Sequence, residues 1–266
     1  MNERDIASMK KQLISLADAV LPQSIKDKIF GLGFNLAPAR FEEFAYKYAF
    51  APNMALSLKD IARRGLQPKH VADVGAYGGH FAQMARSIWP DARITMVEGN
   101  EDKRNILTKV ARDIDASLQI ALLGSKDGEQ VEFHVMESGS SVFEENSPLG
   151  RRSETRTLRT LDAILGDGPP VDFIKIDIQG YELEAFRGAE IILPQVDAVL
   201  MEISLIEINK GAPLFAEVVA FMKERDFVAH EIAEVHRRPL DGAMNQIDML
   251  FIRPSSPLIS NTAHYS

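Results

Sequence analysis

The chain has 266 residues, of which 45% are hydrophobic and 26% are charged. These proportions are typical of a soluble globular protein, and the length suits one or two domains. The formal net charge of −8 argues against a broad phosphate-binding surface, so we expect no nucleic-acid partner. Because the chain has no cysteine, it has no disulfide, thiolate zinc site or thiol nucleophile.

The hydropathy pattern predicts neither a membrane span nor a secretion signal. Uninterrupted apolar runs stay well short of about 18 residues, and the N-terminus lacks the charged-then-apolar order of a signal peptide. We therefore expect a cytoplasmic location, which the absence of cysteine also suits.

The spacing of apolar residues in 1–65 predicts helices. Apolar residues recur at helical spacing in the first of them: Ile6, Met9, Leu13, Leu16 and Val20. Two further helical stretches are expected, at 41–48 and at 54–64. We interpret residues 1–65 as a helical lid over the main domain or as an oligomerisation segment that joins copies of the chain.

Strands and helices alternate from residue 66 to residue 255, which predicts one α/β domain built on a mostly parallel sheet. Strands are expected at 71–75, 93–98, 118–123, 171–177, 197–203, 227–232 and 246–252. Helices are expected at 79–89, 101–112, 181–191 and 212–225. The last two strands lack an intervening helix, so we expect them to form an antiparallel hairpin at the sheet edge. Residues 256–266 form a C-terminal tail.

Residues 125–160 interrupt this alternation. The segment 130–136 alternates like a half-exposed strand, and 151–159 is an extended basic segment. Its arginines could contact an acidic acceptor or simply form a solvated surface.

A glycine-rich turn, Asp73-Val-Gly-Ala-Tyr-Gly-Gly79, follows the first predicted strand and precedes a helix. Such a turn lets backbone N–H groups and a helix N-terminus approach a ligand closely. The second strand ends at Glu98, whose carboxylate can accept hydrogen bonds from both hydroxyls of a ribose. The turn and the acid together predict a nucleoside-cofactor site.

Two details distinguish between cofactors. The glycines are Gly75, Gly78 and Gly79, which is not the G-x-G-x-x-G spacing of a dinucleotide site. Asp73 would repel a pyrophosphate but would suit the positively charged amino-acid end of S-adenosylmethionine (SAM). We therefore favour SAM, with an NAD-dependent oxidoreductase as the weaker alternative.

Four residues are candidate catalytic groups. Asp177 ends the fourth predicted strand and Glu202 lies near the same end of the fifth, where ligands bind in open α/β sheets. His230 and His236 flank the terminal hairpin. Asp177 is our first choice for a general base and a histidine the second, although Asp177 could instead cap the following helix. A divalent metal could be held by Asp177, Glu202 and a third oxygen, but no spaced ligand motif demands one.

The chain resembles the FkbM-type SAM-dependent methyltransferases over about residues 70–253. The matching segments, in chain order, are Asp73–Gly79, Glu98–Asn100, Ser140–Ser141, Arg159–Asp162, Ile174–Glu182, Arg187–Ala189 and Leu200–Ile203. The resemblance implies a Rossmann-like sheet of seven strands, mostly parallel with an antiparallel terminal hairpin. It also implies methyl transfer to a hydroxyl oxygen of a small molecule or glycan, often a sugar or a secondary metabolite.

The same resemblance implies cofactor contacts. Asp73, Gly75 and Gly79 would form the SAM turn, and Glu98 would hold the ribose with Asn100 close by.

Two positions depart from the family pattern. Tyr77 stands where the family usually has Asn, so we expect the polar end of the cofactor to be held differently. Gln179 replaces the usual Glu of the K-I-D-V-E-G block that begins before Asp177. The lost carboxylate leaves a second interpretation, a non-catalytic scaffold or regulator that binds SAM as a ligand.

Overall fold

The computed structural model describes residues 22–49, 52–136, 139–146, 150–261 and 263. The chain divides into two compact units between Ala51 and Pro52. The predicted helix that contains Ile6 to Val20 lies outside the described residues.

The described part of the first unit consists of α2 (Gln23–Leu36) and α3 (Pro38–Ala49). Proline suits the first position of α3, because an N–H there has no intrahelical partner. Exposed apolar side chains recur every three or four residues along α2: Ile25, Ile29, Leu32 and Leu36. The role of this unit as a lid or oligomerisation segment stays a prediction.

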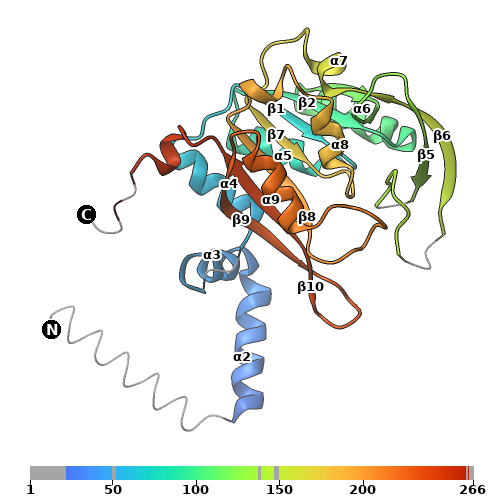
Figure 1. Cartoon of the computed structure of the whole chain (residues 1–266). Coiled ribbons are helices and arrows are strands. Elements are labelled where there is room, and N and C mark those ends of the chain that lie inside the picture. The colour runs from blue at the N-terminus through green and yellow to red at the C-terminus, as the bar shows by residue number, and fades with distance from the viewer. Residues whose placement is uncertain (1–21, 50–51, 137–138, 147–149, 262, 264–266) are drawn as a thin grey trace. The chain divides into compact units, whose positions relative to one another are not determined.

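Within the described residues of the second unit, seven strands form one sheet in the order β3-β2-β1-β7-β8-β10-β9 (Figure 1). Their bounds are β1 (His70–Val74), β2 (Arg93–Glu98), β3 (Ser117–Ile120), β7 (Phe173–Ile176), β8 (Ala198–Ser204), β9 (Val228–Arg237) and β10 (Met244–Ile252). The neighbours from β3 to β8 pair in parallel, and β10 pairs antiparallel with both β8 and β9. The predicted parallel sheet with an antiparallel terminal hairpin is therefore confirmed.

Helices cover both faces of this sheet. Their bounds are α4 (Met54–Arg63), α5 (His80–Ile88), α6 (Arg104–Asp113), α7 (Leu161–Leu165), α8 (Glu182–Arg187) and α9 (Phe215–Lys223). Successive strand residues face opposite sides, so Val71 packs in the core with α4, α5 and α6. Val74 packs in the other core, with α7, α8 and α9.

The helix α4 belongs to the second unit. Asn53 caps it by accepting a hydrogen bond from the N–H of Leu56, and Leu58 and Ile61 on its inner face are each 1% exposed. The division between the units therefore lies before α4, whereas the sequence placed a boundary after residue 65.

The predicted strand at 118–123 is divided in the structure. Its first part is β3, and Leu122–Leu123 (β4) pairs instead with β6 (Arg152–Arg159), which also pairs with β5 (Gln130–Val135). Leu122, Phe133 and Leu158 form a small apolar core there. The segment that interrupts the alternation is thus a small second sheet.

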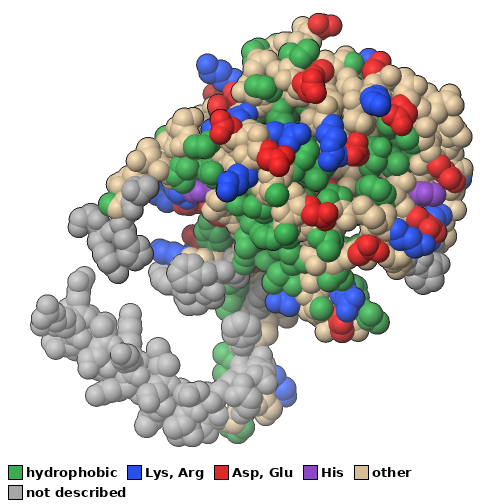
Figure 2. Space-filling view, in the orientation of Figure 1, with side chains coloured by type: hydrophobic (Ala, Val, Ile, Leu, Met, Phe, Trp, Pro, Cys, Tyr) green, Lys and Arg blue, Asp and Glu red, His purple; other side chains and the backbone are tan. Residues whose placement is uncertain are grey.

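The surface of the second unit carries charges of both signs. The face shown in Figure 2 has acidic and basic side chains interspersed. In the part of the chain that the structure describes, no helix has the length and apolar character that crossing a membrane requires.

Candidate functional site

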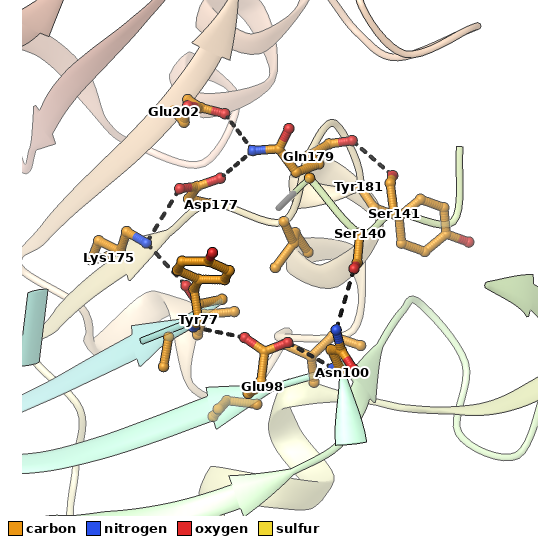
Figure 3. Close-up of a pocket in the computed structure, with 18 of the residues that line it drawn as sticks. Tyr77, Glu98, Asn100, Ser140, Ser141, Lys175, Asp177, Gln179, Tyr181 and Glu202 are labelled. Carbon is orange, nitrogen blue, oxygen red and sulfur yellow. Dashed lines mark hydrogen bonds and ion pairs between the residues drawn. The ribbon is translucent and has the colours of Figure 1, made fainter. Parts of the chain in front are cut away.

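A cavity of about 570 Å³ lies at the C-terminal edge of the parallel strands in the second unit (Figure 3). Most of the site residues predicted from the sequence line it: Gly75, Tyr77, Glu98, Asn100, Asp177, Glu202 and His236. Leu122 and Phe133 of the small sheet contribute an apolar wall. The strand ends bring these residues together because parallel strands end at the same edge.

The glycine turn has no room for side chains at two positions. Gly75 has φ +76, and a β-carbon there would lie 1.8 Å from the carbonyl oxygen of Asp177. Gly79 has φ +77 and begins α5, and a β-carbon there would lie 2.8 Å from Cγ1 of Val110. Glycine at both positions lets the turn fit between the end of β7 and α6.

Tyr77 adopts the left-handed conformation without being glycine, with φ 49. Asn, which the family usually has there, tolerates that conformation better than an aromatic residue. The Tyr77 ring lies under the ammonium of Lys103, 4.0 Å from the ring centroid, and forms part of the cavity wall.

Glu98 is fixed by two backbone hydrogen bonds. Its Oε2 accepts from the N–H of Tyr77 at 2.8 Å, and its Oε1 accepts from the N–H of Asn100 at 2.6 Å. Each carboxylate oxygen can accept a second bond. The side chain thus presents two oriented acceptors to the cavity, the pattern that vicinal hydroxyls require.

Asp73 lies behind the turn and does not line the cavity. It is fully buried, and burial raises its pKa to about 6. Among the described residues neither of its oxygens has a hydrogen-bond partner, and the ammonium of Lys175 lies 3.8 Å away. The structure therefore places Lys175, and not Asp73, at the cavity.

Lys175 connects the turn to the end of β7. Its Nζ donates to the carbonyl of Gly75 at 3.2 Å and lies 3.5 Å from Oδ2 of Asp177. Burial alone would lower the pKa of Lys175, but the carboxylates of Asp177 and Asp73 outweigh burial and raise it. The site therefore contains a charged ammonium between two carboxylates.

Asp177 and Glu202 share one amide. Nε2 of Gln179 donates to Oδ1 of Asp177 at 2.9 Å and to Oε2 of Glu202 at 3.0 Å (Figure 3). Burial, and then the nearby Asp177 and Asp248 carboxylates, raise the pKa of Glu202 well above its ordinary value.

His236 forms a pair with Asp248, a residue that the sequence analysis missed. Nε2 of His236 lies 2.7 Å from Oδ2 of Asp248, and this hydrogen bond raises the pKa of His236. Both residues line the cavity, although Asp248 is only 3% exposed. An acid inside the apolar strand at 246–252 was the available signal.

His230 does not line the cavity. It lies 3.4 Å from the guanidinium of Arg64, and burial lowers its pKa. The structure thus separates the two candidate histidines and brings only His236 to the other site residues.

Two serines hold the loop opposite β7. Ser141 Oγ donates to the carbonyl of Gln179 at 2.8 Å. Ser140 Oγ lies 2.9 Å from both the N–H and the carbonyl of Met136 and accepts from Asn100 at 3.5 Å. The sequence connected these serines with the family but assigned them no role.

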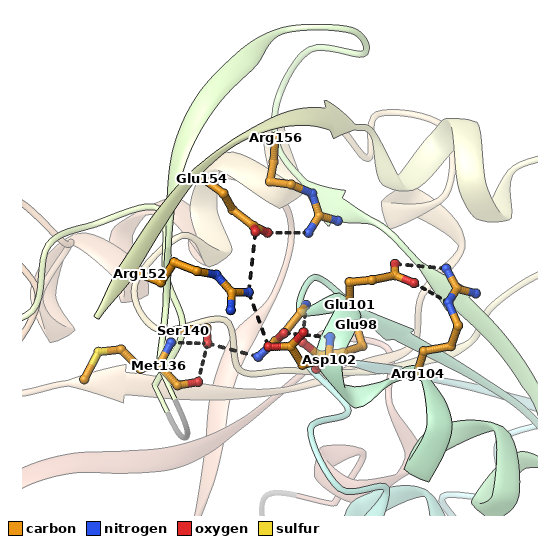
Figure 4. A network of polar contacts seen from close by, with 10 residues as sticks. Glu98, Glu101, Asp102, Arg104, Met136, Ser140, Arg152, Glu154 and Arg156 are labelled. Carbon is orange, nitrogen blue, oxygen red and sulfur yellow. Dashed lines mark hydrogen bonds and ion pairs between the residues drawn. The ribbon is translucent and has the colours of Figure 1, made fainter. Parts of the chain in front are cut away.

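Arginines of the extended basic segment are paired with acids, as Figure 4 shows for Arg152 and Arg156. Arg152 lies 3.3 Å from Asp102 and 3.5 Å from Glu154, and Arg156 lies 2.9 Å from Glu154. Arg151 lies 3.6 Å from Glu144. Acidic side chains of β6 and of neighbouring segments thus compensate the charges of these arginines.

Within the described residues, no three His, Asp or Glu side chains are arranged as a metal site. Between the two predicted ligands, Asp177 and Glu202, the structure has the amide of Gln179.

The strand order defines a Rossmann-like α/β protein, and its cavity lies at the strand ends, where ligands bind in such folds. The model of the methyltransferase FkbM domain matches residues 73–229, more than half of the chain. The chain belongs to the FkbM methyltransferase family.

Solved structures of several methyltransferases are similar to this chain. The N-terminal domain of EvdMO1 with SAH bound is 11% identical, with a TM-score of 0.47 over 78% of this chain and 84% of that one. A precorrin-6y C5,15-methyltransferase from Geobacter metallireducens GS-15 is 12% identical, with a TM-score of 0.43 over 74% and 86%. A ribosomal protein L11 methylase from Lactobacillus delbrueckii subsp. bulgaricus is 15% identical, with a TM-score of 0.42 over 75% and 76%. No curated protein matches the chain.

Proposed function

We propose that this protein is a SAM-dependent O-methyltransferase that methylates a hydroxyl of a sugar or secondary metabolite. The observation that carries the proposal is the cavity, which joins Gly75 and Glu98 at one end to Asp177, Glu202 and His236 at the other. Membership of the FkbM family supports methyl transfer as the reaction.

The residues present fit SAM. Glu98 offers two anchored oxygens for the ribose hydroxyls, and Leu122 and Phe133 offer an apolar wall for the adenine. The carboxyl groups of Glu98 and Asp177, which line the cavity, suit a positively charged ligand. When bound, SAM supplies a methyl group on a sulfonium sulfur that leaves readily.

We assign removal of the acceptor proton to His236. Lys175 and Gln179 already approach the two oxygens of Asp177, which leaves that carboxylate better suited to orient the acceptor hydroxyl. His236 directs Nε2–H to Asp248, so Nδ1 is the nitrogen that takes the proton. An imidazole is the side chain that most often serves as a general base. Asp248 acts through His236 as a positioning residue.

The charges at this end of the cavity favour a neutral acceptor. Asp177 and Asp248 would repel a phosphate or carboxylate group, and the ammonium of Lys175 already lies between Asp73 and Asp177. The arginines that could attract such a group are paired with Asp102, Glu144 and Glu154. We therefore propose a neutral hydroxylated molecule as the acceptor class.

Calorimetry tests the cofactor. SAM and its demethylated product should bind, with NAD much weaker, and Glu98→Ala should lose about 1.5–3 kcal/mol of binding free energy because the ribose loses a charged acceptor. Tighter binding of NAD than of SAM would overturn the assignment in favour of an oxidoreductase.

Labelled methyl transfer tests the reaction. Purified protein and labelled SAM are incubated with separate glycan, small-metabolite and RNA fractions, and the labelled product is examined for an O-methyl group. Label in a glycan or metabolite fraction supports the proposal. Label in RNA alone, or in no fraction, contradicts it, and the second result favours a non-catalytic SAM-binding protein.

A further inference from the structure

The two carboxylates at the ends of β7 and β8 meet on one nitrogen. Nε2 of Gln179 lies 2.9 Å from Asp177 and 3.0 Å from Glu202 (Figure 3). An amide nitrogen donates hydrogen bonds and a carboxyl oxygen accepts them, and here the nitrogen of the amide, not its oxygen, faces both acids. The amide nitrogen has two hydrogens and can donate one to each acid.

The backbone fixes where this amide stands. Gln179 has the left-handed φ of 58, and its carbonyl accepts from Ser141 at 2.8 Å and from Asn209 at 2.9 Å. Gly180 follows with φ +98, and a β-carbon there would lie 2.6 Å from that of Ala212. The side chain at position 179 therefore starts from a rigid point.

Glu202 is held by amides alone among the contacts that the structure gives. Its Oε2 also accepts from Nε2 of Gln246 at 2.6 Å. The ammonium of Lys175 lies on the far side of Asp177, 3.5 Å from Oδ2, and so neutralises one acid of the pair more than the other. The pairing of β7 with β8 brings Asp177 next to Glu202. The shared donor at position 179 then links their two carboxylates.

We propose that Gln179 is a positioning residue that holds Asp177 and Glu202 as a divalent cation would, so that this site works without a metal ion between them. A glutamate at position 179 would bring three carboxyl groups together and would remove the amide donor that Asp177 and Glu202 share. Carboxylate oxygens are the ligands that Mg²⁺ and Mn²⁺ prefer, so a bound cation would then be the means of holding them together. The single change Gln179→Glu should therefore turn the site into a cation site.

The use of Asp177 and Glu202 toward an acceptor rests on the proposed function, but cation binding does not. Failure of methyl transfer with every acceptor would count against the proposed function and leave the following measurements meaningful.

The test titrates Mn²⁺ alone into the full-length protein by calorimetry. Wild type should show no saturable Mn²⁺ binding up to about 1 mM. Gln179→Glu should bind Mn²⁺ with a dissociation constant at least about tenfold below that limit. The double variant that adds Asp177→Asn should lose this binding. Gln246→Glu is the matched control, because it also removes an amide donor from Glu202 but does not contact Asp177.

Thermal unfolding is a second test of the same proposal. In EDTA, Gln179→Glu should melt below wild type, since three carboxylates repel one another. Saturating Mn²⁺ should raise its melting temperature by roughly 5 °C and leave wild type unchanged. Once an acceptor has been identified, methyl transfer by Gln179→Glu should require Mn²⁺, whereas methyl transfer by wild type should not.

Two results would overturn the inference. One is saturable Mn²⁺ binding by wild type that Asp177→Asn abolishes. The other is a folded Gln179→Glu variant that shows no response to Mn²⁺ in either measurement. If this variant folds poorly, the wild-type titration still tests the first of these outcomes.

Discussion

Gly75 and Asp177 are in direct contact: a β-carbon on Gly75 would lie 1.8 Å from the carbonyl oxygen of Asp177. The residues are 102 positions apart in the sequence but stand at the ends of the adjacent strands β1 and β7. This contact joins the proposed cofactor turn to the proposed acceptor edge. A shift of one must move the other, because backbone meets backbone.

Gly75→Ala should therefore lose both stability and cofactor binding. The added methyl group needs a backbone shift, and φ +76 is itself unfavourable for alanine, so we expect a loss of about 3 kcal/mol or more. Gly128→Ala is the control: it has φ +83 with no atom within 4 Å of the added carbon, and should cost only about 1–2 kcal/mol. Urea unfolding and calorimetry with the demethylated cofactor measure the two effects. Equal losses in both variants would show that the contact with Asp177 is unimportant.

Asp248→Asn should lower the pKa of His236, because the hydrogen bond that raises this pKa loses its charge. The acidic limb of the pH–rate profile should move to lower pH, with a smaller maximum rate as the ring loses its orientation. Titration of the His236 ring by NMR checks the shift directly.

The same pair predicts a pH-dependent stability. A histidine pKa that is raised on folding adds stability that is complete below its unfolded value of about 6.5 and is lost as the pH rises through the folded value. Asp248→Asn should thus cost more stability below about pH 6.5 than well above it. His230→Ala should leave the pH–rate profile unmoved, since His230 does not line the cavity. If His230→Ala shifts the pH–rate profile, the assignment of the general base to His236 is wrong.

Glu182 should make the protein less stable at higher pH. Burial raises its pKa from 4.5 to about 7, so ionisation costs more in the folded state than in the unfolded one, and stability falls as the pH rises through this interval. Glu182 Oε1 accepts hydrogen bonds from the N–H groups of Ile178 and Gly180 at 2.8 and 3.1 Å. The amide oxygen of a glutamine at this position can accept the same two bonds. Glu182→Gln should gain up to roughly 3 kcal/mol relative to wild type between these pH values. Denaturant unfolding at several pH values measures it, and Glu182→Ala, which loses the acceptor, should be destabilised throughout.

The ion pairs of Lys175 and of Arg152 should contribute differently to the free energy of unfolding, because their burial differs. Lys175→Met leaves the buried Asp73 and the partly buried Asp177 without their cation, and should cost about 3–5 kcal/mol. Arg152→Ala breaks pairs whose arginine is 60% exposed, and should cost less than about 1 kcal/mol and leave acceptor turnover unchanged. Thermal unfolding and turnover compare the two. Adding Asp73→Asn should restore part of the stability of Lys175→Met, and a lack of rescue would contradict the electrostatic cause.

Local sequence predicted most elements but not all of their ends. The strand expected at 118–123 divides at Ala121, because Leu122 and Leu123 pair with β6 rather than continue in the main sheet. The helix expected at 181–191 ends at Arg187, and a β-carbon on Gly188 would lie 2.3 Å from the carbonyl of Gly124. In both places a contact with a distant segment overrides the local periodicity.

The sequence by itself determined the fold and one edge of the site. Alternating apolar strands and helices predict a parallel sheet, and Gly75, Glu98, Asp177 and Glu202 all lie at or near the C-terminal ends of strands that must share an edge. Only the tertiary structure decided which side chains meet at that edge. His236 reaches Asp248 through the pairing of β9 with β10, which is irregular on both sides of Asp248. Gln179 reaches two acids because β7 and β8 are neighbours and Ser141 fixes its backbone. Such pairings depend on register and on contacts between residues far apart in the chain, and local composition does not specify them.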